Sequence, residues 1–198
     1  MTDYTETEVK LYVPYLEAVQ ARLETIGAAL VSPRVFERNV RYDNAERSLT
    51  PAGIVLRLRQ DTRARLTYKA EGEMQHGIVS RFEAEVEVSD FEAMETILGR
   101  LGYTPYMVYE KYRTTYELDG AEIVLDEMPY GNFVEIEGDE DTIEKVINRL
   151  GLQQAARYDG SYAVLFERVR RALGLTFTDL TFANFKDVDV PESAFLNA

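Results

Sequence analysis

The sequence predicts an α+β fold, or an all-β barrel with helices packed on its outside, with about eight antiparallel strands and four helices. Three observations favour this class. The expected strands follow one another in neighbouring pairs with short connections. The expected helices carry apolar stripes that must be buried against something. The strict alternation of strand and helix that marks a doubly wound parallel sheet is missing.

The first half of the chain alternates in hydrophobicity like strands, with one helix near the start. "VPYLEAVQARLETIGA" predicts that helix, with Pro14 at its first position and Gly27 after its end. The letters "DTR" between two short alternating runs predict a hairpin. The expected strands are residues 4–12, 34–43, 54–60, 64–70 and 79–88.

The second half adds three helices and three strands. "SDFEAMETILGRLGY" predicts a helix with Ser89 or Asp90 as its cap and with an inward stripe that includes Ile97 and Leu101. Asp-Gly at 119–120 is the strongest short hairpin signal in the chain. The expected strands are residues 106–118, 121–128 and 132–138, and the other helices are residues 139–152 and 161–175.

Length and composition fit one domain. The chain has 198 residues, of which 45% are hydrophobic, and we expect a domain over residues 1–175 with a tail, 176–198, that packs onto it. The net charge of −13 argues against a nucleic-acid partner and against an anionic membrane surface. The polar N-terminus does not resemble a signal peptide, and no apolar run suggests a membrane helix. We therefore expect a soluble cytoplasmic protein.

The residue types restrict the chemistry. The chain has no cysteine, which excludes disulfides, thiolate metal sites and cysteine nucleophiles. Its one histidine, His76, lies in "EGEMQHGIVS" and is expected to be a solvated loop residue. A catalytic metal would therefore be held by carboxylates, which select hard ions such as Mg²⁺ or Mn²⁺.

Charged side chains recur at alternate positions of nearly every expected strand. Because strand side chains alternate between two faces, residues two apart share a face. Acidic pairs occur in "TETEVKLYV", "RFEAEVEV" and "FVEIEG", and basic pairs occur in "VLRLRQ" and "EKYRTTY". The residues are Glu6, Glu8, Lys10, Arg57, Arg59, Lys69, Glu83, Glu85, Lys111, Arg113, Asp126, Glu135 and Glu137.

Two interpretations of this pattern are open. An antiparallel sheet with one wet face alternates in the same way. However, these faces are almost purely ionic, and the apolar faces are needed to receive the helices. If the helices coat the apolar side, the charged side closes into a lumen, and a barrel of about eight strands leaves room for a ligand. Such a lumen suits a polyanion with divalent cations, as phosphoryl transfer requires.

The same residues resemble the CYTH family, also called triphosphate tunnel metalloenzymes. The motifs are "ETEVK" at 6–10, "LRLR" with Arg57 and Arg59, "TYKA", "RFEAEVEV", "EKYR", "IVLDEMPYGNFVEIEG" and "SYAVLF", and the match spans about residues 4–170. The resemblance implies an eight-stranded antiparallel barrel that forms a tunnel for a triphosphate compound. The tail after about residue 175 is not covered by it.

The resemblance also implies roles for individual residues. Phosphates would be held by Lys10, Arg57, Arg59, Lys69, Lys111 and Arg113. One or two divalent ions, Mg²⁺ or Mn²⁺, would be held by Glu6, Glu8, Asp126, Glu135 and Glu137. Glu6, Lys10, Lys69 and Glu137 would take part in catalysis, with one carboxylate helping to activate the attacking water. Glu83 and Glu85 would line the tunnel.

The substrate and reaction stay open between several alternatives. The leading hypothesis is hydrolysis of inorganic triphosphate or of an organic triphosphate. The second is a class IV adenylate cyclase, in which the ribose 3′-hydroxyl attacks the α-phosphorus of ATP; a non-catalytic polyphosphate or nucleotide binder is the third. "NVRYDN" has Arg41 where the family often has an aromatic residue, and Arg41 is a candidate phosphate contact or a solvated edge charge. A base could stack on Tyr42, Tyr68, Tyr106 or Tyr109, and the tail could cap the tunnel or form a homodimer contact.

Overall fold

The computed structural model describes residues 4–158 and 160–196. Residues 1–3 of the polar N-terminus and residues 197–198 of the expected tail lie outside the described residues. The strands are β1 (Thr5–Tyr12), β2 (Ala29–Asp43), β3 (Val55–Gln60), β4 (Ala64–Lys69), β5 (Glu73–Gln75), β6 (Ile78–Val88), β7 (Thr104–Leu118), β8 (Ala121–Met128), β9 (Gly131–Glu137) and β10 (Arg157–Tyr158). The helices are α1 (Leu16–Thr25), α2 (Phe91–Arg100), α3 (Glu140–Leu150), α4 (Tyr162–Leu173), α5 (Phe182–Phe185) and α6 (Ser193–Leu196).

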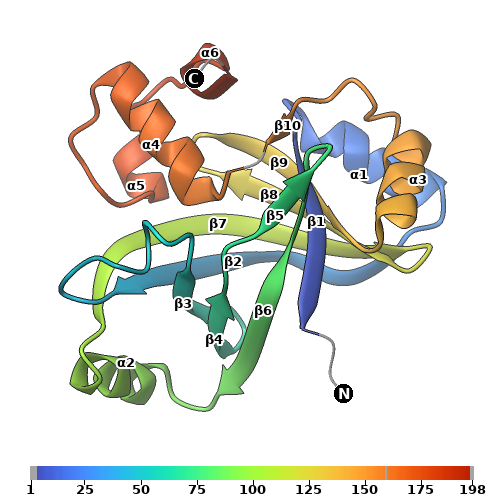
Figure 1. Ribbon diagram of the computed structural model, residues 1–198. Helices are drawn as coiled ribbons and strands as arrows, with labels where there is room; N and C mark the ends of the chain where they lie inside the picture. The colour runs from blue at the N-terminus through green and yellow to red at the C-terminus, as the bar shows by residue number, and fades with distance from the viewer. Residues whose placement is uncertain (1–3, 159, 197–198) are drawn as a thin grey trace.

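Eight of the strands close into a ring, in the order β1, β9, β8, β7, β2, β3, β4, β6. The pairing of β1 with β6, in which Thr7 lies opposite Ser80, closes it. Every pairing in the ring is antiparallel, and the short strands β5 and β10 extend its margins. The expected α+β class, with eight antiparallel strands and helices packed around them, is confirmed (Figure 1).

Several local features agree with the sequence signals, and a few differ. Asp119 and Gly120, with φ of 56° and 87°, form the tight hairpin between β7 and β8. Asp90 caps α2 by accepting from the backbone N–H of Ala93. β2 starts five residues earlier than expected, because a shift in its pairing between Ser32 and Val35 accommodates Pro33, which has no N–H. Helix α1 starts at Leu16, after Pro14 rather than at it.

The main core lies on the outside of the ring, under α1 and α3. Outward-facing residues of β1, β8 and β9, including Val9, Leu11 and Ile123, pack against apolar residues of these two helices, such as Leu23 and Ile147. All five side chains are at most 1% exposed. The apolar positions of these strands therefore point away from the ring interior.

Helix α2 covers a smaller area of the outer surface, over β2 and β3. Leu98 is buried there beside Val40, Tyr42 and Leu58. The expectation that Ile97 and Leu101 face inward is wrong, because they are 50% and 68% exposed. The contact is narrow, so only part of the predicted stripe is covered.

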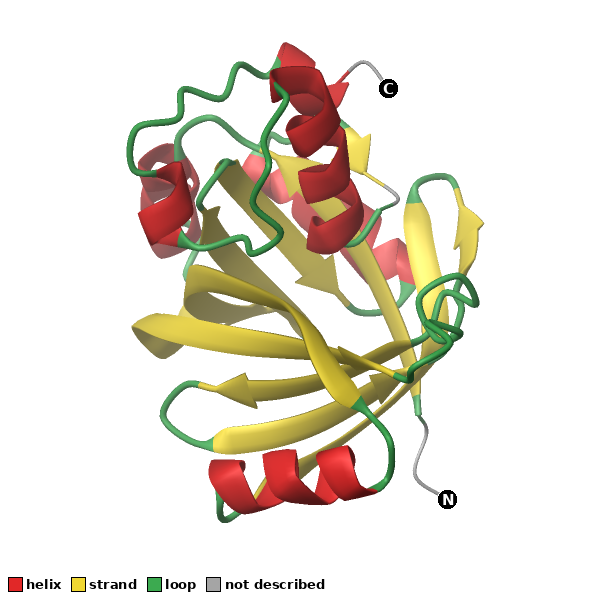
Figure 2. Ribbon diagram, turned by 90° about the vertical axis from the view of Figure 1, so that its left-hand side faces the viewer, coloured by secondary structure: helices red, strands yellow, loops and turns green. Residues whose placement is uncertain are grey.

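The C-terminal segment packs on another part of the ring, where it forms a second buried cluster. This C-terminal cluster comprises Met107, Tyr109, Met128, Tyr130, Phe133, Tyr158, Tyr162, Leu165, Phe166, Val169, Leu180, Phe185, Ala194 and Phe195, with Tyr12 and Tyr106 packed against it. Figure 2 shows α4 on the side of the strands opposite α2. Leu180 bridges to Tyr109 of β7 and bonds through its backbone to Val108 and Glu110, beyond the last pair of β7 with β8. Among the described helices, none combines the length and apolar character that crossing a bilayer requires.

Candidate functional site

A charged cavity of about 400 Å³ lies inside the ring. It is lined by all the site residues predicted from the sequence except Asp126. These are Glu6, Glu8, Lys10, Arg41, Arg57, Arg59, Lys69, Glu83, Glu85, Lys111, Arg113, Glu135 and Glu137. The charged faces of the strands therefore point into a lumen and not, as on an ordinary half-buried sheet, into open solvent.

The alternation of side chains along each strand explains this arrangement. In β1, Val9 and Leu11 are buried under the helices, so Lys10 between them points to the other side. Because the sheet closes on itself, the eight strands of the ring present their second face to its interior. Lys10 is therefore only 6% exposed although it is charged.

Asp126 holds two of the predicted phosphate-binding cations in place. It is fully buried, accepts a hydrogen bond of 2.9 Å from Lys111 and takes two bonds of 2.7 and 2.6 Å from Arg113. The hydroxyl of Tyr162 on α4 donates to the same carboxylate at 2.8 Å. Asp126 lies behind the cavity wall, where it fixes the side chains that reach the cavity.

Glu135 and Tyr162 complete this central group. Glu135 accepts from Arg113 at 2.6 Å and forms an ion pair with Lys10. Although burial acts to raise it, the pKa of Glu135 is held well below its usual value by Lys10, Arg113 and Lys111. The ring of Tyr162 lies 4.6 Å from the ammonium of Lys10 and 5.4 Å from that of Lys111. The two lysines are thus oriented by a residue from the C-terminal helix.

The two arginines of β3 line an adjacent wall. Arg59 donates to Glu85 at 3.0 Å and lies 3.5 Å from Glu37. Arg57 donates to the Tyr109 hydroxyl at 3.2 Å and to Thr67 at 3.0 Å. Although burial acts to raise it, the pKa of Glu37 is lowered to about 2 by nearby cations, of which Lys111 acts most strongly.

A group rich in carboxylates lines another part of the cavity. Glu6 accepts from Lys69 at 2.8 Å and from Arg81 at 3.1 Å, and Arg81 also donates to Glu8 at 2.6 Å. The pKa of Glu83 is raised to about 7, first by burial and then by its hydrogen bond with Glu6. Although burial acts to raise it, the pKa of Glu6 is lowered to about 2 by that bond and by the charges of Lys69 and Arg81. Of the two, Glu83 is therefore the carboxyl that holds a proton more readily.

Glu137 is the least compensated acid of this group. Its pKa is raised to about 7 by burial and by repulsion from Glu6, Glu122 and Glu8. Within the described residues, the carboxylates of Glu137 and Glu122 have no ion-pair or hydrogen-bond partner. Negative charge is thus in excess here.

This group fits a hard divalent ion by its donor chemistry. All its donors are carboxylate oxygens, which suit Mg²⁺ or Mn²⁺, and an added cation would relieve the repulsion around Glu137. In the described part of the chain, no three such side chains converge closely enough to hold an ion as they stand. Glu6 is paired with Lys69 and Arg81, and Glu8 is paired with Arg81.

The structure adds site residues that the sequence reasoning left out. Glu37, Arg65, Arg81 and Tyr162 line the cavity, yet none was predicted as a site residue. Glu37 and Arg81 had a readable signal, because they share alternate strand positions with Arg41 and with Glu83. Tyr162 lies in the motif "SYAVLF" that contributed to the family resemblance, but no site role was assigned to it, and a helix far along the chain brings it to the ring.

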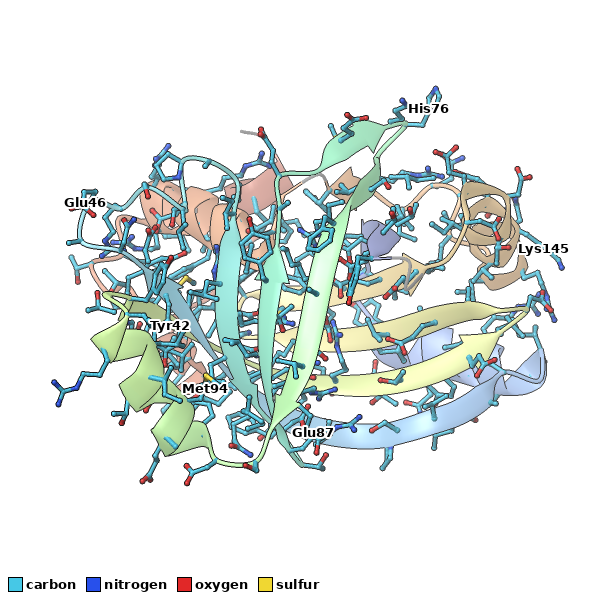
Figure 3. All side chains as sticks on the ribbon, turned by 60° about the horizontal axis from the view of Figure 1, so that its bottom comes forward. Tyr42, Glu46, His76, Glu87, Met94 and Lys145 are labelled. Carbon is cyan, nitrogen blue, oxygen red and sulfur yellow. The ribbon has the colours of Figure 1, made fainter. Side chains whose placement is uncertain are left out.

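His76 takes no part in the cavity. It is exposed in the turn between β5 and β6, as expected for a solvated loop residue, and Figure 3 shows it at an outer tip of the molecule.

Comparison with known proteins identifies a matching family model and a related sequence. The family model described as the CYTH domain matches residues 5–155. A protein of Methanocaldococcus jannaschii, provisionally named an adenylate cyclase, is 25% identical over 134 residues, which cover 67% of this chain and 75% of that protein.

Two solved structures share the fold. A candidate adenylate cyclase of Vibrio parahaemolyticus is 20% identical with a TM-score of 0.69, and the match covers 84% of this chain and 99% of that one. A Hippeastrum protein named a candidate adenylyl cyclase, and described as having a dominant triphosphatase activity, is 19% identical with a TM-score of 0.63. That match covers 82% of this chain and 95% of the Hippeastrum chain.

Proposed function

The chain belongs to the CYTH domain family, and from that premise we propose that it hydrolyses a triphosphate in the ring cavity with the help of a divalent metal ion. The observation that carries the proposal is the division of the cavity wall. One part gathers cations that suit a phosphate chain, and another gathers carboxylates in excess of their cationic partners. A polyphosphate chain together with a metal ion would satisfy both.

The phosphate chain would be bound by the cavity cations that now form ion pairs with carboxylates. Lys10, Arg57, Arg59, Lys69, Lys111 and Arg113 all line the cavity. Glu135, Asp126 and Glu85 hold several of them in position. Because these partners fix the cations before the substrate arrives, little side-chain freedom is lost on binding. Glu135 and Asp126 thus act through the cations in this proposal, although the sequence suggested them as metal ligands.

Glu6, Glu8 and Glu137 would hold the ion, Mg²⁺ or Mn²⁺. When bound, it would supply charge neutralisation at the phosphate oxygens and lower the pKa of water. Phosphate oxygens would draw Lys69 and Arg81 away from Glu6 and Glu8, which frees both carboxylates. Substrate and metal binding would therefore favour each other.

The reaction would be an in-line displacement at the terminal phosphorus. The water oxygen forms the new P–O bond, and the bond to the bridging oxygen breaks, so that diphosphate leaves with the electron pair. The proton of the water passes to a carboxylate of the acidic group, for which Glu6 and Glu137 are the candidates. Lys10 and Lys69 would balance the charge that develops on the transferred group and on the leaving oxygen.

Adenylate cyclase activity is the second candidate, because the Methanocaldococcus jannaschii relative carries that name. In that reaction the ribose 3′-hydroxyl attacks the α-phosphorus and pyrophosphate leaves. It requires a place for adenine as well as for three phosphates.

A substrate panel separates these activities. Tripolyphosphate, ATP and thiamine triphosphate are each incubated with Mg²⁺ or Mn²⁺, and the products are identified by mass. We expect phosphate release, whereas cyclic AMP with pyrophosphate would establish the cyclase, and tight binding without turnover would establish a binder. Glu6→Gln should abolish metal-dependent turnover. The matched control is Glu46→Gln, an exposed carboxylate that Figure 3 shows at the periphery of the molecule.

A further inference from the structure

Arg41 differs from every other cation on the cavity wall. Lys10, Arg57, Arg59, Arg63, Arg65, Lys69, Arg81, Lys111 and Arg113 each have a carboxylate within 4 Å. In the described part of the chain, Arg41 has none, and it makes no hydrogen bond through its guanidinium. It is nevertheless only 6% exposed, and its buried Nε lacks any partner.

Such a group is costly in a ligand-free protein. A buried charge is normally paired, because losing its hydration without a compensating partner destabilises the fold. Here the cost is increased by Arg57, which lies directly opposite Arg41 in the pairing of β2 with β3. An anionic ligand would relieve the repulsion and satisfy the free guanidinium, so Arg41 points to a bound anion and not to a structural ion pair.

The surroundings of Arg41 describe what kind of anion fits. The guanidinium of Arg41 lies 5.7 Å from the ring of Tyr106, and the residue opposite Arg41 in the pairing of β2 with β7 is Met107. Both residues pack into the C-terminal cluster, so this cluster backs Arg41. Tyr109 also belongs to that cluster, and its hydroxyl already accepts a hydrogen bond from Arg57. A phosphate that reached Arg41 would thus meet cations on one side and packed aromatic rings on the other.

In the part of the chain that the structure describes, none of the tyrosines that the sequence offered for base stacking has a free ring beside Arg41. Arg47 covers the ring of Tyr106 at 4.6 Å, and the ring of Tyr42 is buried under α2, where its hydroxyl donates to Glu95 at 2.8 Å. Tyr68 points outward, where it is 39% exposed and contacts Phe82. The end of a phosphate chain at Arg41 would therefore be a bare ionised phosphate and not a phosphate that carries a nucleoside.

We propose that Arg41, with Arg57, binds the ionised terminal phosphate of an inorganic chain and thereby selects inorganic triphosphate over nucleoside triphosphates. The inference rests on the proposed function and specifies the substrate class of the same cavity. A nucleoside triphosphate presents one ionised terminal phosphate, which the reaction requires at the acidic group. Tripolyphosphate presents two, and the second is the group that Arg41 receives.

The test compares substrate preference in two arginine variants. Arg41→Met removes the charge but keeps much of the length, and Arg47→Met is the matched control, because Arg47 lies over the same tyrosine but is exposed and outside the cavity. We expect Arg41→Met to lower kcat/KM for tripolyphosphate by about 10- to 100-fold, the effect of one lost charge-assisted contact, and that for ATP by less than about threefold. Arg47→Met should leave both values unchanged, and Arg41→Lys should recover part of the preference.

Thermal unfolding without metal gives a readout that does not depend on turnover. Tripolyphosphate should raise the Tm of the wild type more than that of Arg41→Met, whereas the ligand-free variant should melt at or above the wild-type temperature. The inference would be overturned if Arg41→Met lowered kcat/KM equally for tripolyphosphate and ATP, if it left the ratio of the two kcat/KM values unchanged, or if Arg47→Met had the same effect. The proposed triphosphatase function would not be affected by these results. Absence of turnover of every triphosphate by the wild type would instead refute the proposed function.

Discussion

Replacing Asp126 with asparagine should destabilise the protein strongly and change its metal requirement little. The carboxylate is fully buried and neutralises Lys111, which is 2% exposed, as well as Arg113. Asparagine keeps the shape, but it removes the charge and turns an N–H₂ group toward donors. Removing one partner of a buried ion pair costs about 3–5 kcal/mol, and we expect a loss of this size in the free energy of unfolding.

Urea unfolding of the metal-free protein measures this loss, and the dependence of the rate on Mg²⁺ concentration measures the metal requirement. Glu137→Gln is the matched control, since it makes the same chemical change at a cavity carboxylate that is only partly buried and has no cationic partner among the described residues. We expect Glu137→Gln to raise the Mg²⁺ concentration needed for half-maximal rate and to cost little stability. If Asp126→Asn were as stable as the wild type, within about 1 kcal/mol, and needed about tenfold more Mg²⁺, Asp126 would be a metal ligand and the assignment made here would fail.

Three further predictions follow from the same structure. Because the pKa of Glu137 is raised from 4.5 to about 7, the folded protein binds this proton more tightly than the unfolded chain does, and the stability that the proton contributes is lost as the pH rises from about 5 to 8. Glu137→Gln should therefore reduce the fall in unfolding free energy over this pH range, while Glu83, whose pKa is also raised, maintains part of the fall. An unchanged dependence of the unfolding free energy on pH, measured by urea unfolding without metal, would count against the repulsion described. Arg59→Lys keeps the charge but loses the planar guanidinium, whose Nη2 now donates to both oxygens of Glu85 and whose Nη1 lies near Glu37. KM for tripolyphosphate should therefore rise by about tenfold with kcat nearly constant, and a selective fall in kcat would contradict a uniform binding role. Phe195→Ala should cost about 3–5 kcal/mol in urea unfolding, because this ring is 1% exposed and contacts Tyr12, Tyr130 and Phe133, whereas Tyr15→Ala, at a 73% exposed position, should cost almost nothing.

The direction of the charged side chains was predictable because it depends on a local rule. Alternation places Glu6, Glu8 and Lys10 on one face of β1, and the apolar stripes of the helices require the other face. Once the sheet closes, the shared face becomes the cavity wall. Local rules also predicted the hairpin at Asp119 and the cap at Asp90, since each depends on residues that are close in sequence.

Features that depend on contacts between distant residues were not predictable in this way. Alternation puts Asp126 on the inward side, but only the packing of α4 surrounds it with Tyr162 and removes it from the cavity surface. The exposure of Ile97 and Leu101 likewise depends on how narrow the contact of α2 is. That Arg41 has no partner among the described residues appears only when the side chains of β2, β3 and β7 are placed together.

Along three strands, the row of side chains that faces the ring interior changes from charged to aromatic, and this change makes the C-terminal segment part of the site. In β1 the row passes from Lys10 to Tyr12, in β9 from Glu135 to Phe133, and in β7 from Lys111 to Tyr109. The aromatic ends of these rows all pack with the C-terminal cluster, while their charged ends line the cavity.

Tyr162 stands where the two regions meet, because its ring packs in the cluster and its hydroxyl bonds to Asp126. It lies after residue 155, where the match to the CYTH domain ends. The helix that carries it closes the aromatic part of the ring and at the same time orients Lys10 and Lys111. Loss of this helix would therefore expose apolar surface and release two cavity lysines together, so the stability of the ring and the phosphate binding that we propose for it depend on the same contacts.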